Sequence, residues 1–138
     1  MQTDLNIMPQ SVWILDDDQY FLQLVNKLLN NYFKETSSKL FTNKEKFMVA
    51  MRKLNVPQMI ILDYNLGVSK AKHDTAHEVL NQLEEIAKNI PVILISGEKN
   101  EGLLEEYQKY RNIDYIVKND QFAKNFYISL NKLQNFNS

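Results

Sequence analysis

Short apolar runs alternate with amphipathic segments along this chain, and this alternation limits the possible folds more than any other feature. The apolar runs have the length of strands, contain many β-branched or aromatic residues, and have polar flanks. Four of them predict buried strands: Val12–Leu15, Met59–Leu62, Pro91–Ile95 and Tyr115–Val117. A fifth run, Lys39–Thr42, is short and flanked by charge, which is typical of an edge strand.

Between these runs, apolar residues recur three and four positions apart, which predicts amphipathic helices. The predicted apolar stripes are Phe21, Leu24, Val25, Leu28 and Leu29; Phe47, Ala50, Met51 and Leu54; Val79, Leu80, Leu83, Ile86 and Ala87; Leu103, Leu104, Tyr107 and Tyr110; and Phe122, Phe126, Leu130 and Leu133. Strict alternation of strand and helix favours right-handed crossovers and a parallel sheet with helices on both faces. The sequence therefore predicts a doubly wound α/β sandwich.

Composition narrows the class of protein further. The chain has 138 residues, of which 44% are hydrophobic, and this suits one domain with a sizeable core. A net charge of -1 gives no overall reason to bind nucleic acid or an anionic membrane. The chain lacks cysteine, which excludes disulfides, thiolate metal sites and thiol catalysis, and no apolar run approaches the ~20 residues of a membrane span. We expect a soluble protein of the reducing cytoplasm.

Polar side chains follow the predicted strands at their carboxyl ends, which is where open α/β sheets bind ligands. These side chains are Asp16, Asp17 and Asp18 after the first strand, Asp63 after the third, Ser96 after the fourth and Lys118 after the fifth. Like charges at the end of a buried strand repel and are costly to desolvate, so the aspartates require compensation. Clustered carboxylate oxygens suit Mg²⁺, and the bound cation would compensate the negative charge of the aspartates.

Four motifs carry a resemblance to a known family: "ILDDD" after the first strand, "IILDYNL" around Asp63, "VILISG" at the fourth strand and "DYIVK" at the fifth. In this order and spacing, the chain resembles the receiver domain of two-component response regulators of the chemotaxis-regulator type. The resemblance implies one receiver domain over residues 1–138, with a core at about 12–133 and short tails. It also implies a five-stranded parallel sheet in the flavodoxin-like order 2-1-3-4-5, with helices on both faces.

The resemblance assigns a role to each acidic residue of the site. Asp63 would accept a phosphoryl group from a sensor histidine kinase or a histidine phosphotransfer protein and form an aspartyl phosphate. Asp17 and Asp63 would hold Mg²⁺ directly, with the backbone carbonyl of Asn65 as a third ligand and Asp16 acting mainly through water. The resemblance gives Asp18 no such role, and we expect it either to cap the helix that follows it or to be solvated.

The remaining site residues are expected to bind the phosphoryl group or to transmit the signal. The resemblance implies that the Ser96 hydroxyl binds the phosphoryl group, that Lys118 pairs with its charge, and that Ser96 and Tyr115 form the switch. The output surface would be the fourth helix, fifth strand and fifth helix, which would contact a second copy or a downstream protein. We expect no contact with nucleic acid or membrane from this domain. It would be a signalling switch that catalyses only its own phosphorylation and dephosphorylation.

A second cluster offers a competing metal site. His73 and His77 are spaced i, i+4, and with Glu78 they have the residue types that bind a transition metal. We favour exposed histidines, with Asp74 or Thr75 capping the next helix. The segment from Tyr64 to Asp74 is expected to be a long structureless loop, which often has a function.

The chain departs from the usual family pattern at several positions, none of which removes a chemical group from the site. The loop after Asp63 is about four residues longer than usual, Gly67 stands where proline is common, Thr75 replaces a frequent glycine, and Asn119 follows Lys118 where most members have proline.

Two other functions stay open beside the phosphorylatable switch. One is a receiver-like interaction module that takes no phosphate. The other is a Mg²⁺-dependent phosphatase with an aspartate nucleophile. Asp16 and Asp18 have the two-residue spacing of such enzymes, but no residue pattern after them supports this alternative. Few residues follow Leu133, so we expect either a stand-alone receiver or an excised piece of a longer chain.

Overall fold

The computed structural model describes residues 9–53, 56–68, 73–86, 89–97, 105 and 112–136. A parallel sheet of five strands runs through the centre, in the order β2-β1-β3-β6-β7. The strands are β1 (Ser11–Leu15), β2 (Ser37–Phe41), β3 (Met59–Asp63), β6 (Val92–Ser96) and β7 (Ile113–Val117). Counted among themselves, these strands follow the order 2-1-3-4-5, which confirms the predicted doubly wound α/β fold.

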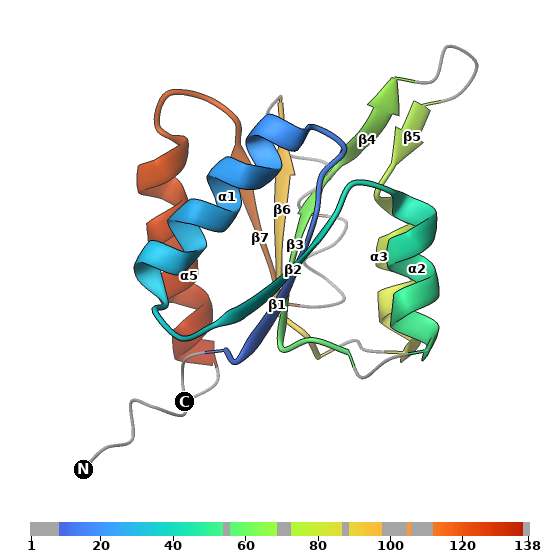
Figure 1. Cartoon of the computed structure of the whole chain (residues 1–138), viewed down its shortest axis with the longest axis horizontal. Helices are drawn as coiled ribbons and strands as arrows, with labels where there is room; N and C mark the ends of the chain where they lie inside the picture. The colour runs from blue at the N-terminus through green and yellow to red at the C-terminus, as the bar shows by residue number, and fades with distance from the viewer. Residues whose placement is uncertain are drawn as a thin grey trace.

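Helices cover both faces of the sheet, as Figure 1 shows. Their bounds are α1 (Gln19–Tyr32), α2 (Lys44–Lys53), α3 (His77–Ile86) and α5 (Phe122–Phe136). Helices α1 and α5 lie on one face, and α2 and α3 lie on the other (Figure 1). The predicted stripe from Leu103 to Tyr110 lies outside the described residues, as do Leu54 and Ala87.

The core consists of two apolar layers, because the central strands are buried on both faces. One layer joins the sheet to α1 and α5, and the other joins it to α2 and α3. The prediction for α1 was partly wrong: Leu22 is buried with 2% of its surface exposed, whereas Leu24 is 42% exposed. Because successive helical residues are rotated by about 100°, Leu22, Val25 and Leu29 share one face, and Leu24 points away from it.

The two ends of the segment after β3 are short strands that pair with each other as a hairpin. The prediction of a structureless loop was therefore wrong. Strands β4 (Asn65–Val68) and β5 (His73–Thr75) pair antiparallel, with Asn65 opposite Thr75. The hairpin is anchored at its base, where Leu66 joins the core beside α2 and α3 and the Ala76 N–H donates to the Tyr64 carbonyl at 2.8 Å. Residues 69–72 lie outside the described part.

Pairing in β5 also changes how α3 begins. Asp74 and Thr75 lie in β5, and α3 begins after them at His77, where the Ala76 carbonyl accepts from the Leu80 N–H at 2.9 Å. The prediction that Asp74 or Thr75 caps α3 concerns side chains outside the described set and stays a prediction. His77 is exposed, as predicted, and the side chain of His73 lies outside the described set. Among the described residues, no helix has both the length and the apolar character of a membrane span.

Candidate functional site

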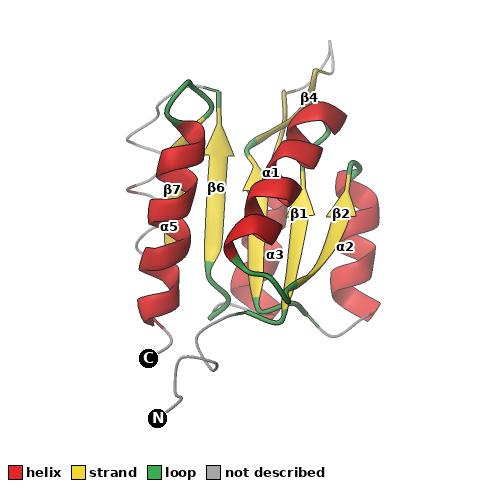
Figure 2. Ribbon diagram, turned by 60° about the vertical axis from the view of Figure 1, so that its left-hand side comes forward, coloured by secondary structure: helices red, strands yellow, loops and turns green. Residues whose placement is uncertain are grey.

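The carboxyl ends of the central strands meet at one edge of the sheet. Figure 2 shows the strand arrowheads pointing toward the edge from which the β4–β5 hairpin extends. Register places the ends level, because Leu15 of β1 pairs with Leu62 of β3. Asp16 and Asp63 each follow one of these two residues directly, so the register brings the two aspartates side by side.

Lys118 lies between these two aspartates. Its Nζ is 3.3 Å from Asp16 Oδ2 and 3.4 Å from Asp63 Oδ1. Both carboxylates are buried, while the lysine side chain is 22% exposed. The backbone N–H of Lys118 donates to the Ser96 carbonyl at 2.8 Å, which extends the β6–β7 pairing and delivers the ammonium to the strand ends. The structure thus unites three residues that the sequence predicted at one site.

The other two aspartates of the "DDD" run make different contacts. Asp17 is exposed and contributes an oxygen to a cluster with Asp16 and Asp63, in which the oxygens lie within 4.8 Å of one another. Asp18 caps α1, as predicted, because its Oδ1 accepts from the N–H groups of Tyr20 at 3.0 Å and Phe21 at 3.3 Å. The Asp18 N–H also donates to Asp16 Oδ1 at 2.9 Å and so holds that carboxylate in place.

In the described part of the chain, the carboxylates at this edge of the sheet outnumber the single ammonium that lies among them. Burial, followed by the charge of Asp16, raises the pKa of the Asp63 carboxyl to about 7, although Lys118 acts against the shift. Burial also raises the pKa of Asp16, against the Asp18 N–H bond and Lys118. Asp16 Oδ2 is in the ion pair with Lys118 yet accepts no hydrogen bond from the described residues.

The donor set fits a divalent cation that prefers oxygen. Asp16, Asp17 and Asp63 provide three clustered carboxylates, and the ammonium of Lys118 neutralises only part of their charge. Mg²⁺ is such an ion, and it binds through one or two carboxylates and keeps several waters. Asn65 begins β4 two residues after Asp63, and the assignment of its carbonyl as a ligand stays a prediction.

Ser96 and Tyr115 lie where the sequence predicted them, on neighbouring strands. Ser96 is buried at the end of β6, and Tyr115 of β7 is half-buried against the core beside α2 and α3. Tyr115 pairs in register with Leu94, two residues before Ser96. Their roles in a switch stay predictions.

Sequence reasoning missed a contact of Phe21 with the site. The ring of this residue was predicted as part of the apolar stripe of α1, and it does pack against the core beside α1 and α5. Its face also meets Lys118, whose Nζ lies 4.3 Å from the ring centroid. The two residues are far apart in the sequence and no local pattern links them, so only the tertiary structure could have revealed the contact.

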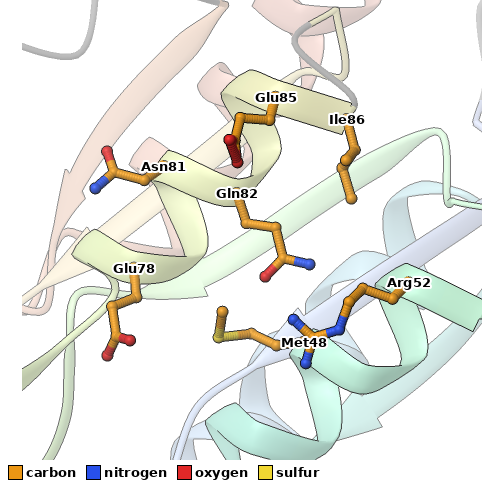
Figure 3. Close-up of a pocket in the computed structure, with 7 residues that line it drawn as sticks. All are labelled: Met48, Arg52, Glu78, Asn81, Gln82, Glu85 and Ile86. Carbon is orange, nitrogen blue, oxygen red and sulfur yellow. The ribbon is translucent and has the colours of Figure 1, made fainter.

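A separate groove lies between α2 and α3. It encloses about 420 Å³ and is lined by side chains of both helices, including Met48, Arg52 and Glu85 (Figure 3). Glu78 of α3, which also lines the groove, pairs with Lys44 of α2, with 2.6 Å between Nζ and Oε1. Its lining includes none of the strand-end carboxylates, so the groove is not part of the acidic site.

Removing Asp17 tests the metal site directly. Mg²⁺ that binds the native state should raise the thermal midpoint of the wild type. We expect Asp17→Asn to bind Mg²⁺ about tenfold more weakly, which at a fixed high concentration removes about 1.4 kcal/mol of the added stability. Asp18→Asn is the matched control, because asparagine also caps helices and Asp18 lies outside the cluster. Melting curves with and without Mg²⁺ measure the difference, and identical responses of wild type and Asp17→Asn would exclude Asp17 as a ligand.

Comparison with known proteins gives independent information about the family and the fold of this chain. A family model described as "Response regulator receiver domain" matches residues 12–125. No curated protein sequence is significantly similar to the chain. Among solved structures, the phosphorylated cyanobacterial phytochrome response regulator RcpA is similar with a TM-score of 0.70 and 22% identity, covering 91% of each chain.

Two further structures share the fold. The beryllofluoride-activated receiver domain dimer of NtrC4 has a TM-score of 0.74 at 14% identity, covering 94% of this chain and 99% of that one. The Mn²⁺-bound response regulator Rcp1 has a TM-score of 0.69 at 20% identity, covering 93% of this chain and 94% of that one. At these identities the likeness establishes the fold alone.

Proposed function

This chain belongs to the response regulator receiver domain family, and from that membership we propose that it is a phosphorylatable switch of two-component signalling. Asp63 accepts a phosphoryl group from a histidine kinase or a histidine phosphotransfer protein. One observation carries the assignment: Asp63 ends the central strand β3 beside both a second buried carboxylate and the ammonium of Lys118. Receiver domains are signalling switches, and this one acts only on its own phosphorylation state.

The chemistry is transfer of an anionic phosphoryl group from a histidine nitrogen to a carboxylate anion. An oxygen of Asp63 forms a bond to phosphorus while the bond from phosphorus to the donor nitrogen breaks, and the product is an acyl phosphate. Asp63 must be ionised to attack, and Lys118 lowers the cost of that charge. Mg²⁺ held by Asp16, Asp17 and Asp63 supplies, when bound, positive charge that offsets the repulsion between carboxylate and donor. Lys118 then pairs with the phosphoryl oxygens, and the Ser96 hydroxyl donates to one of them.

Transmission of the signal follows from these new acceptors. Ser96 at the end of β6 turns toward the phosphoryl group, and the space that it leaves favours an inward position of Tyr115 on the neighbouring strand. The surface that changes includes β7 and α5, and the fourth predicted helix that would complete it lies outside the described residues. The partner at this surface is a second copy or a downstream protein. Two similar structures provide precedents: RcpA is phosphorylated, and the beryllofluoride-activated receiver domain of NtrC4 is a dimer.

The phosphatase alternative needs Asp18 as a second catalytic carboxylate two residues after Asp16. Asp18 instead accepts two backbone hydrogen bonds of α1, and this capping role counts against the alternative. The interaction module that takes no phosphate keeps the same fold, and the labelling experiment distinguishes it.

Acetyl phosphate with Mg²⁺ tests the proposal, with intact-mass spectrometry as the readout. We expect one phosphoryl group on the wild type, released by hydroxylamine, and none on Asp63→Asn. Asp18→Asn serves as the control, because it also removes a carboxylate of the "DDD" run but keeps the cap, and it should be labelled like the wild type. An unlabelled wild type would favour the interaction module, repeated turnover of the donor would favour the phosphatase, and equal labelling of Asp63→Asn would exclude Asp63.

A further inference from the structure

We propose that Phe21 is a positioning residue of this site, which holds the Lys118 ammonium between Asp16 and Asp63 through the face of its ring. The contact is short, with 4.3 Å between Nζ and the ring centroid, and the same Nζ is 3.3 and 3.4 Å from the two carboxylates. The ammonium is therefore enclosed by two anions and one aromatic face. The catalytic consequence rests on the proposed function, whereas the positioning itself does not.

The ring is fixed by both helices on its side of the sheet. Phe21 lies in the first turn of α1, and its N–H donates to the Asp18 cap. Its ring meets Phe122, the first residue of α5, with the centroids 4.8 Å apart and the planes at 63°. Phe122 in turn stacks on buried Phe126 at 5.6 Å and 15°. The ring therefore has the support that a positioning residue needs.

The turn after β7 links this support to Lys118. Asn119, which stands where the family pattern usually has proline, organises the turn: its Oδ1 accepts from Gln121 N–H at 2.9 Å and its carbonyl from Phe122 N–H at 3.0 Å. The turn that follows Lys118 thus also starts α5 and places Phe122 against Phe21. Lysine and ring are held by one structural unit.

The ring affects the ammonium in two ways. Its negative face attracts the charge, and its apolar bulk displaces water that would otherwise hydrate Nζ. A lysine side chain has many rotamers, and three contacts around Nζ select one of them. An ammonium that is already partly desolvated and fixed in position loses less hydration and less conformational freedom when it pairs with a phosphoryl oxygen. For a lysine exposed by about a fifth, we expect a cation–π contribution equal to about a fivefold change in rate or equilibrium.

The test compares removal of the ring with its replacement. Phe21→Leu keeps an apolar side chain without a π face, and Phe21→Tyr keeps the face. We expect Phe21→Leu to slow phosphorylation by acetyl phosphate about fivefold at saturating Mg²⁺, Phe21→Tyr to restore the rate, and the control Tyr20→Leu, which removes an exposed ring of the same turn, to leave it unchanged. Equal slowing by leucine and tyrosine would overturn the inference.

A double-mutant cycle makes the test independent of phosphorylation. Unfolding equilibria without metal are measured for Phe21→Leu, Lys118→Met and the double variant, and we expect the two sites to couple by about fivefold. Additive effects would overturn the positioning role, whatever the phosphorylation results. A wild type that takes no phosphoryl group, combined with a coupled cycle, would refute the proposed function and still support the contact.

Discussion

Replacing Lys118 with methionine is expected to lower the free energy of unfolding by about 3 kcal/mol at pH 8 without divalent metal. The variant removes the ammonium that lies 3.3 Å from Asp16 and 3.4 Å from Asp63 while both carboxylates stay buried. Loss of one partner from a buried ionic group leaves uncompensated charge, and this is the source of the cost. Methionine has a similar length and keeps the apolar stem, so the change isolates the charge.

Urea unfolding measures this cost, and a second ion pair provides the matched control. Lys132 Nζ is also 3.3 Å from a carboxylate, that of Asp114, but its side chain is 56% exposed. Lys132→Met should therefore cost less than about 1 kcal/mol. Mg²⁺ should recover part of the loss in Lys118→Met, because the cation supplies charge at the same carboxylates. Equal costs of the two substitutions would show that Lys118 is not an essential counter-charge.

The acidic site could be predicted because its geometry follows from strand pairing. Asp16 and Asp63 each follow a buried apolar run, and parallel strands end at one edge, so their proximity needs no knowledge of side-chain packing. The same rule places Lys118 after the fifth strand. Asp18 could be predicted as a cap because capping is a local interaction with the next few backbone N–H groups.

The features that sequence reasoning missed depend on contacts between distant segments. Leu22 is buried rather than Leu24 because the sheet determines which face of α1 is covered, and both choices fit a helical period. The β4–β5 hairpin was missed because only β4 alternates, with Leu66 and Val68 two residues apart, while the short partner strand β5 contains no apolar residue. Leu66 contacts a core that other segments build, and this contact is visible only in the fold. Phe21 satisfied the prediction of a core residue, so nothing in the sequence suggested a second role beside Lys118.

Asp63→Asn is expected to raise the free energy of unfolding by about 2 kcal/mol at pH 8 without metal. In the folded protein, burial and the charge of Asp16 raise the pKa of Asp63 from 3.8 to about 7. The folded state then retains a proton that the unfolded state releases, so the contribution of this carboxyl to stability is complete below pH 3.8 and is lost as the pH rises to about 7. Asparagine has no proton to lose, although it forgoes the ion pair with Lys118, and this limits the gain.

The sign of the change in the free energy of unfolding shows whether the charge of Asp63 destabilises or stabilises the folded protein. The advantage of Asp63→Asn over the wild type should be small near pH 4 and largest above pH 7, measured by unfolding with a chelator present. Asp114→Asn, which removes an ion-paired carboxyl of β7 remote from the cluster, should show no such gain. Mg²⁺ should narrow the difference at pH 8, because it stabilises the wild type more than the variant that lacks a ligand. A constant difference from pH 4 to pH 8 would mean that Asp63 carries no unfavourable charge in the folded state. A difference that grows with pH and shrinks with Mg²⁺ would mean that the fold bears the cost of a carboxylate kept ready for a cation and a phosphoryl group.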